Sequence, residues 1–160
     1  MADALLLAPT VAFAAATVYA TAVATTEPDL LGEPLGLRPP GRVRSHLVLG
    51  WGSAISAPWP MAVIATCAAS RGRQGSARAA RTVALVGAGI VAGTLAEPVT
   101  WGRRPASARA RVSVPLHLAI GTAMALAGTH RLRQQVEMSR ASTSTPSTHA
   151  MLAREGFLNR

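Results

Sequence analysis

Four long apolar runs with no charged side chain in their central parts constrain this 160-residue chain more than any other feature. The first extends from Ala4 to Thr26, and the others cover about residues 46–70, 79–97 and 112–130. Each is close to the ~20 residues that a helix needs to cross the hydrocarbon core of a bilayer. A helix on the surface of a soluble protein would instead carry a polar face. The sequence therefore predicts an all-α integral membrane protein with four transmembrane helices in a bundle.

All sixteen basic residues are arginine, and the formal net charge is +9. A nucleic-acid-binding domain gathers its basic residues on one face. Here most of them lie in short clusters beside the apolar runs, as the flanks of membrane spans require. The clusters are Arg38, Arg42 and Arg44; Arg71, Arg73, Arg78 and Arg81; Arg103, Arg104, Arg109 and Arg111; and Arg131, Arg133 and Arg140. The pattern predicts arginine-rich loops, contact with the lipid bilayer and no nucleic-acid partner.

The first apolar run is expected to be retained as a span, because Asp3 and no basic residue precedes it and because it is longer than the apolar core of a signal peptide. The membrane domain should cover residues 1–131, followed over 132–160 by a flexible polar tail rich in Ser and Thr. The arginines divide equally between the two sides, so the positive-inside rule does not fix the orientation. An even number of spans without an export signal favours a multi-pass protein of the cell membrane with both termini in the cytoplasm.

The two halves of the chain share an ordered pattern. Shifted by about seventy residues, Glu27-Pro28 lies over Glu97-Pro98, and the His-Leu-x-x-Gly stretch at His46 lies over the same stretch at His117. Matches between Ala-rich spans would mean little, but two ordered motifs at nearly equal separation indicate an internal repeat. Two helices per repeat predict a bundle of two duplicated helical hairpins, related by an axis along the membrane normal.

This repeat places the two Glu-Pro motifs and the two histidines at one face of the membrane. A proline disfavours helix at the residue before it, so the first and third spans should end at Glu27 and Glu97. His46 and His117 open the second and fourth spans. A glutamate at a helix C-terminus and a cationic histidine at an N-terminus both oppose the helix dipole. The presence of these four residues at the helix ends is therefore not explained by stabilisation of the helices.

Three interpretations of this Glu/His cluster remain open. The glutamates can pair with loop arginines, as intramembrane acids usually do with a basic partner. The four residues Glu27, His46, Glu97 and His117 can bind one or two divalent metal ions, since carboxylate and imidazole suit zinc, iron or manganese. Glu97 and His117 can also exchange protons during transport or catalysis.

Two other features bear on helix packing. Pro58 and Pro60 lie in the middle of the second run and predict a kink, because each removes a backbone hydrogen bond. Gly89 and Gly93, four residues apart in the third run, predict a face for close helix contact.

The sequence assigns no catalytic residue and no substrate. It favours a binding or accessory membrane module with a Glu/His cluster at one face, acting with a homo-oligomeric or membrane partner. A small membrane enzyme, metal-dependent or proton-transferring and acting on a lipophilic substrate, is one alternative. An oligomeric proton-coupled transporter is the other.

Overall fold

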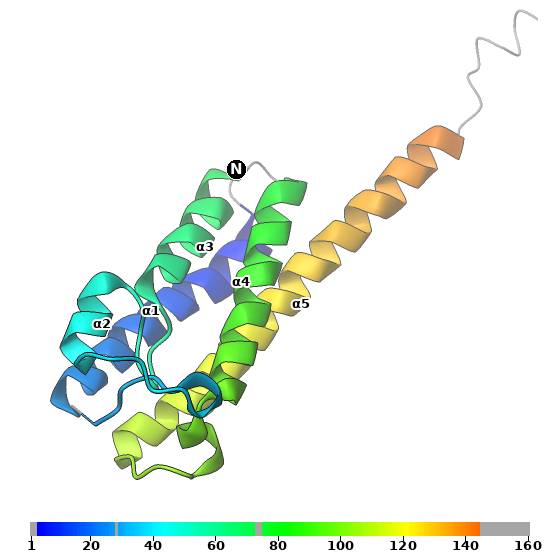
Figure 1. Cartoon of the computed structure of the whole chain (residues 1–160). Coiled ribbons are helices and arrows are strands. Elements are labelled where there is room, and N and C mark those ends of the chain that lie inside the picture. Colours follow the sequence, from blue (N-terminus) through cyan, green and yellow to red (C-terminus); the bar gives the residue numbers. More distant parts are fainter. Residues whose placement is uncertain (1–2, 28, 73–74, 145–160) are drawn as a thin grey trace, which may run out of the picture.

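The computed structural model describes residues 3–27, 29–72 and 75–144, which are helical with irregular connections and contain no strand (Figure 1). Its elements are α1 (Ala4–Thr26), the 3₁₀ turn η1 (Pro34–Gly36), α2 (Val43–Leu49), α3 (Trp59–Arg71), α4 (Ala77–Ala96), the 3₁₀ turn η2 (Pro98–Trp101) and α5 (Ala108–Ser144). The predicted all-α class is confirmed for this part of the chain.

Three of the described helices are long and apolar enough to cross a membrane: α1, α4 and α5 as far as Ser142. In their most apolar windows, only 39%, 28% and 28% of the residues are buried inside the bundle. Large apolar side chains such as Val18, Leu85 and Leu126 are instead exposed on the outside. An outer surface of this kind requires an apolar partner. The fold is compatible with a helical membrane protein.

The run predicted as the second span, 46–70, is not one continuous helix. Helix α2 ends at Leu49, and Gly50 caps it in the left-handed conformation (φ 80°). The backbone is then irregular until Pro58, the N-cap of α3. Pro60 lies in the first turn of α3, where a missing N–H costs nothing. The sequence predicted that the prolines would kink a continuous helix, and this prediction is wrong. The two prolines instead lie at the start of a new helix.

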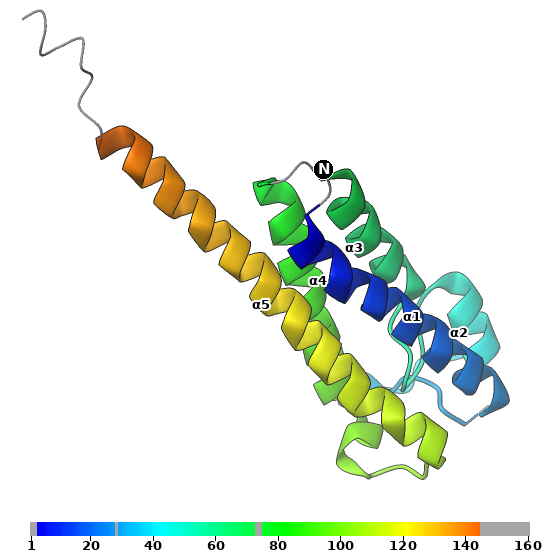
Figure 2. The same cartoon turned by 180° about the vertical axis from the view of Figure 1, so that it is seen from behind.

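The last helix is longer than the predicted span at 112–130. It begins at Ala108 and continues to Ser144, because no glycine or proline follows Gly128 within it and the residues after His130 are mostly good helix formers. Its C-terminal part projects beyond the other helices (Figures 1 and 2). The predicted flexible tail is thus helical over 132–144, and the remainder, 145–160, lies outside the described residues. Many of the arginines expected in loops lie at helix ends.

Helices α1, α3, α4 and α5 pack side by side, with the most extensive contact between α4 and α5. Glycines bring these two backbones together. A Cβ atom on Gly87 would lie 2.5 Å from the carbonyl oxygen of Gly121, and one on Gly128 would lie 2.5 Å from that of Ala80. Small residues permit this approach between membrane helices. Gly89 and Gly93 were predicted to form the close-contact face of this helix, but the contact with α5 is made elsewhere. A Cβ atom on Gly93 would meet nothing within 4 Å.

The α1–α2 and α4–α5 connections lie at the same end of the bundle (Figure 1). Both preceding helices stop where the sequence predicted, with Glu27 and Glu97 as their C-cap residues. The second halves of the two predicted hairpins differ, however. The first is broken into α2 and α3, whereas the second is the continuous helix α5. The fold therefore leaves the predicted duplication as a hypothesis.

Candidate functional site

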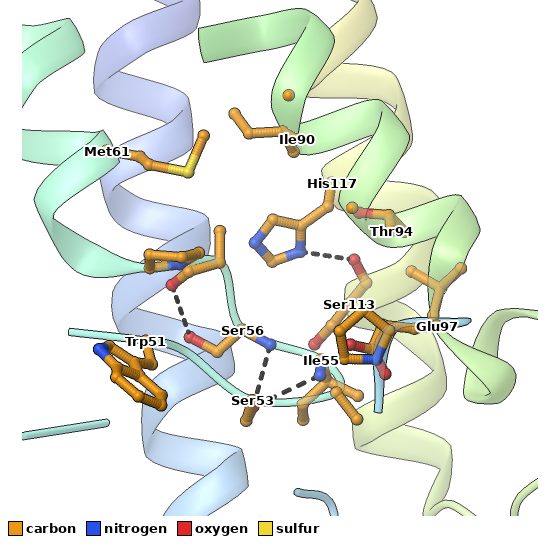
Figure 3. Close-up of a pocket in the computed structure, with 17 residues that line it drawn as sticks. Trp51, Ser53, Ile55, Ser56, Met61, Ile90, Thr94, Glu97, Ser113 and His117 are labelled. Carbon is orange, nitrogen blue, oxygen red and sulfur yellow. Dashed lines mark hydrogen bonds between the residues drawn. The ribbon is translucent and has the colours of Figure 1, made fainter. Parts of the chain in front are cut away.

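A cavity of about 210 Å³ lies between the C-terminal half of α4, the first turns of α5 and the irregular segment that precedes α3 (Figure 3). Most of its wall is apolar, with Ile90 from α4 and Met61 from α3 among the contributors. The polar side chains of the wall are those of Ser53, Ser56, Thr94, Glu97, Ser113 and His117. The broken second segment thus forms one wall of a cavity whose lining includes a buried glutamate, Glu97, and a buried histidine, His117.

The local sequence explains why space remains at this position. Gly89 and Gly93 present no side chain on the face of α4 that lines the cavity. In the segment before α3, Gly52 adopts φ 82° and lets the chain fold back on itself, so that Ser53 N–H donates to the carbonyl of Ser56. A continuous helix over 46–70 would place regular side chains where this backbone now curves away. The cavity is therefore a product of the helix break and of two glycines.

His117 projects from α5 into this cavity (Figure 3). The side chain is buried, and its Nδ1 lies 2.8 Å from the carbonyl oxygen of Ser113, one helical turn earlier. The ring also packs edge-on against Phe13 of α1, with 6.2 Å between ring centroids. Its Nε2 is buried and has no hydrogen-bond partner among the described residues. Two of its contacts therefore hold the ring in place while the second nitrogen stays available.

Glu97 lies at the loop end of the same cavity and is only 8% exposed. Its Oε2 accepts a hydrogen bond of 2.9 Å from the backbone N–H of Glu33. Burial raises the pKa of Glu97 above its ordinary value of 4.5, and the nearby Glu33 carboxylate adds to the rise, while the Glu33 hydrogen bond and the Arg104 guanidinium oppose it. The side chain is thus a candidate proton carrier.

Neither predicted glutamate forms an ion pair with an arginine in the described part of the chain. The Arg104 guanidinium instead donates to the carbonyl oxygens of Asp29 (2.6 Å) and Leu31 (3.0 Å). It also forms an ion pair of 3.4 Å with Glu33. The loop arginine therefore holds the α1–α2 loop rather than Glu27 or Glu97. Glu33 could not be predicted as a functional residue, because nothing in its local sequence distinguishes it from a solvated loop residue.

Glu27 and His46 lie outside the cavity wall. The Glu27 carboxylate accepts hydrogen bonds from the hydroxyl and the backbone N–H of Ser107, in the loop before α5. The Nε2 of His46 lies 2.9 Å from the carbonyl oxygen of Pro40, and its ring packs edge-on against Trp51. The structure thus brings Glu97 and His117 to one cavity. Their counterparts in the first half of the chain, Glu27 and His46, instead form hydrogen bonds with loop residues.

The four residues predicted as metal ligands do not all lie together, because Glu27 and His46 are not in the cavity wall. Over the described ranges, no three His, Cys, Asp or Glu side chains are grouped so as to hold a metal ion. Ser113, which sequence reasoning missed, shares the cavity with His117 because the two are four residues apart on one face of α5. Helical spacing was the signal that would have identified it.

Comparisons of the chain with protein-family models, curated proteins and solved structures find no match. The chemistry of the cavity therefore rests on its own geometry. A largely apolar space with one buried imidazole nitrogen and one buried carboxyl can bind a small molecule and can exchange a proton with it.

Proposed function

We propose that this protein is a membrane-embedded binding module whose cavity takes a small, largely apolar molecule. The observation that carries this proposal is the buried Nε2 of His117, a residue of the cavity wall, which has no hydrogen-bond partner in the part of the chain that the structure describes. Buried polar atoms almost always have a partner, and leaving one without is costly. A ligand that fills the cavity would supply that partner.

The size of the cavity fits a ligand of about one ring. An engineered cavity of about 150 Å³ with apolar walls, in an unrelated protein, binds benzene. The cavity here, at about 210 Å³, is somewhat larger. The walls supplied by Ile90, Met61 and Val114 are apolar, so the body of the ligand should be apolar as well.

The proposal includes a fourth membrane crossing, made by residues 43–71 as a broken span. Helix α3 has 13 residues, or about 20 Å at the helical rise, which is too short to cross alone. It nevertheless packs along α1 and α4, as a crossing helix would. Irregular backbone is tolerated at membrane depth where it is buried in protein or lines a cavity, as the segment before α3 does.

With that crossing, α1 with α3 and α4 with α5 form the two hairpins that the repeat predicts. The matching helix ends at Glu27 and Glu97 support the duplication. Location in the cell membrane, cytoplasmic termini and a homo-oligomeric or membrane partner belong to the same proposal. The span pattern supports the first two.

A proton-transferring membrane enzyme is the second candidate. It is favoured by one observation, namely that Glu97 and His117 line the same cavity without bonding to each other. Two titratable groups at one ligand site can serve as a general acid and a general base. This candidate requires that the cavity binds a ligand, so the same first experiment tests both.

The test uses toluene as a probe for the protein in detergent micelles, with ¹³C-methyl-labelled methionine observed by NMR. Met61 lines the cavity, whereas Met124 is buried outside its wall and Met138 is exposed on the projecting part of α5. We expect toluene to shift the Met61 methyl signal saturably and to leave those of Met124 and Met138 nearly unchanged.

The matched variant is Gly93→Leu, because Gly93 lines the cavity and a Cβ atom there would meet nothing within 4 Å. We expect it to fold and to abolish the saturable shift at Met61. Equal, unsaturable shifts at all three methionines would show that toluene only partitions into the micelle, and would overturn the proposal.

A further inference from the structure

We propose that the cavity selects a neutral ligand carrying a hydroxyl group, which donates its proton to Nε2 of His117. This inference deepens the proposed function and rests on it. It follows from the tautomer that the structure imposes on His117, from a second buried hydroxyl in the same wall, and from the apolar character of the rest of that wall.

The tautomer follows from the contact of Nδ1. This nitrogen lies 2.8 Å from the carbonyl oxygen of Ser113, and a carbonyl oxygen can only accept a hydrogen bond. Nδ1 therefore carries the hydrogen and donates it. In a neutral imidazole the other nitrogen, Nε2, then carries a lone pair and acts only as an acceptor. A ligand that satisfies Nε2 must be a hydrogen-bond donor.

A second group extends the requirement. The hydroxyl oxygen of Ser113 is also buried without a hydrogen-bond partner from residues 3–27, 29–72 and 75–144, and Ser113 lines the same cavity. A serine hydroxyl can donate as well as accept. Both atoms therefore call for a polar ligand, and Nε2 of His117 requires that its partner be a donor.

The surroundings of His117 favour a neutral donor over a charged one. Ile90 and Met61 in the cavity wall and Phe13 against the ring are apolar. Burying a charge among such groups costs far more than burying a hydroxyl that keeps its hydrogen bonds. The acidic side chain of the wall, Glu97, lies at the loop end and already accepts from the backbone of Glu33.

The first test needs no ligand and reads the tautomer of the native chain. In ¹⁵N-histidine-labelled protein, we expect the Nε2 resonance of His117 to be of the unprotonated, pyridine type and that of Nδ1 to be of the protonated type. Addition of phenol should shift the Nε2 resonance saturably. A protonated Nε2 in the neutral ring would overturn the inference.

The second test compares phenol with toluene, which has the same shape but a methyl group in place of the hydroxyl, in the native chain and in His117→Phe. Binding of each is followed at the Met61 methyl. We expect the substitution to weaken phenol binding about three- to tenfold, the size of one net hydrogen bond, and to leave toluene binding nearly unchanged.

The outcomes separate this inference from the proposed function. If toluene binds the native chain and His117→Phe weakens both probes equally, the binding module stands and the hydroxyl selectivity is wrong. If neither probe shifts Met61 in the native chain, the proposed function itself is wrong. If His117→Phe does not fold, the tautomer and the phenol-induced ¹⁵N shift of the native chain still decide the question.

Discussion

The carboxylate of Glu97 accepts a hydrogen bond from the backbone N–H of Glu33, which lies 64 positions earlier in the chain. The bond joins the C-terminal end of α4 to the loop after α1. Gly32 lies beside it, so close that a Cβ atom there would be 3.3 Å from Oε1 of Glu97. The same loop binds the segment next to the cavity, where the N–H of Ala54 donates to the carbonyl of Leu30. Glu97 thus lines the cavity and also holds the loop after α1 in place through a hydrogen bond.

We expect Glu97→Gln to raise the stability of the protein at neutral pH and to remove part of its pH dependence. Because burial raises the folded-state pKa of Glu97, the folded state holds the proton to higher pH than the unfolded state. The contribution of this group is therefore greatest below the ordinary value of 4.5 and is lost as pH rises through the raised pKa. Glutamine cannot ionise, and its amide oxygen can still accept from Glu33.

The measurement is the apparent melting temperature in detergent from acidic to neutral pH. The control is Glu137→Gln, on the exposed, projecting part of α5, which should leave the pH profile of the native chain unchanged. If the melting temperature of Glu97→Gln falls with rising pH in parallel with that of the native chain, the pH dependence does not come from Glu97.

Gly87→Ala should destabilise the bundle, by about 1–3 kcal/mol, because the added methyl group overpacks the α4–α5 contact. A Cβ there would lie 2.5 Å from the carbonyl oxygen of Gly121 and 2.6 Å from the backbone nitrogen of Ala125. Gly93→Ala, on the same helix, is the matched control. It meets no atom within 4 Å and should be neutral or stabilising by up to about 1 kcal/mol, the helix propensity difference. Equal effects of the two substitutions on thermal unfolding would refute the packing.

Gly52→Ala should cost more stability than the double change of Pro58 and Pro60 to alanine. Gly52 has φ 82°, and a Cβ there would lie 2.4 Å from the carbonyl oxygen of Ser56. The left-handed conformation alone costs a residue with a Cβ about 1–2 kcal/mol. The prolines only begin α3, so their loss leaves Gly50 and Gly52 to keep the segment broken. The apparent melting temperatures of the two variants show which substitution costs more stability. If the double proline variant is the less stable, the prolines cause the break between α2 and α3.

Arg104→Ala should release the loop after α1 without unfolding the helices. The guanidinium holds two carbonyl oxygens and Glu33 of that loop, so its removal deletes all three contacts together. Hydrogen exchange followed by mass spectrometry should show faster exchange over residues 29–33 and little change in α4. Arg103→Ala, next to it and exposed, is the control and should change neither. Unchanged exchange in the Arg104 variant would show that the loop is held by other contacts.

Topology reporters fused at positions 36, 75 and 106 test the fourth crossing. If the broken segment crosses the membrane, positions 36 and 106 report one side and position 75 reports the other. The reason is that α1 with α3, and α4 with α5, then form two hairpins with both connections at one end. Positions 36 and 75 on the same side would limit the protein to the three continuous spans.

The sequence by itself determined the features that depend on neighbouring residues. Long apolar runs predict membrane helices because a chain in lipid must satisfy its backbone hydrogen bonds internally. The ends of α1 and α4 at Glu27 and Glu97 followed from the proline after each glutamate, which acts on the preceding residue alone. The extension of α5 to Ser144 was missed, although the helix-forming residues after His130 were visible.

Only the tertiary structure decided which of the matching residues line the cavity. Glu27 and Glu97 each end a helix and precede a proline, yet one binds Ser107 and the other binds Glu33 and borders the cavity. His46 and His117 open similar motifs, yet only His117 lies on an unbroken helix whose face is turned toward α4 and the curved segment before α3. The physical reason is that a side chain's partners depend on segments dozens of residues away. Their positions are set by the break at Gly50–Pro58 and by the glycine contact between α4 and α5.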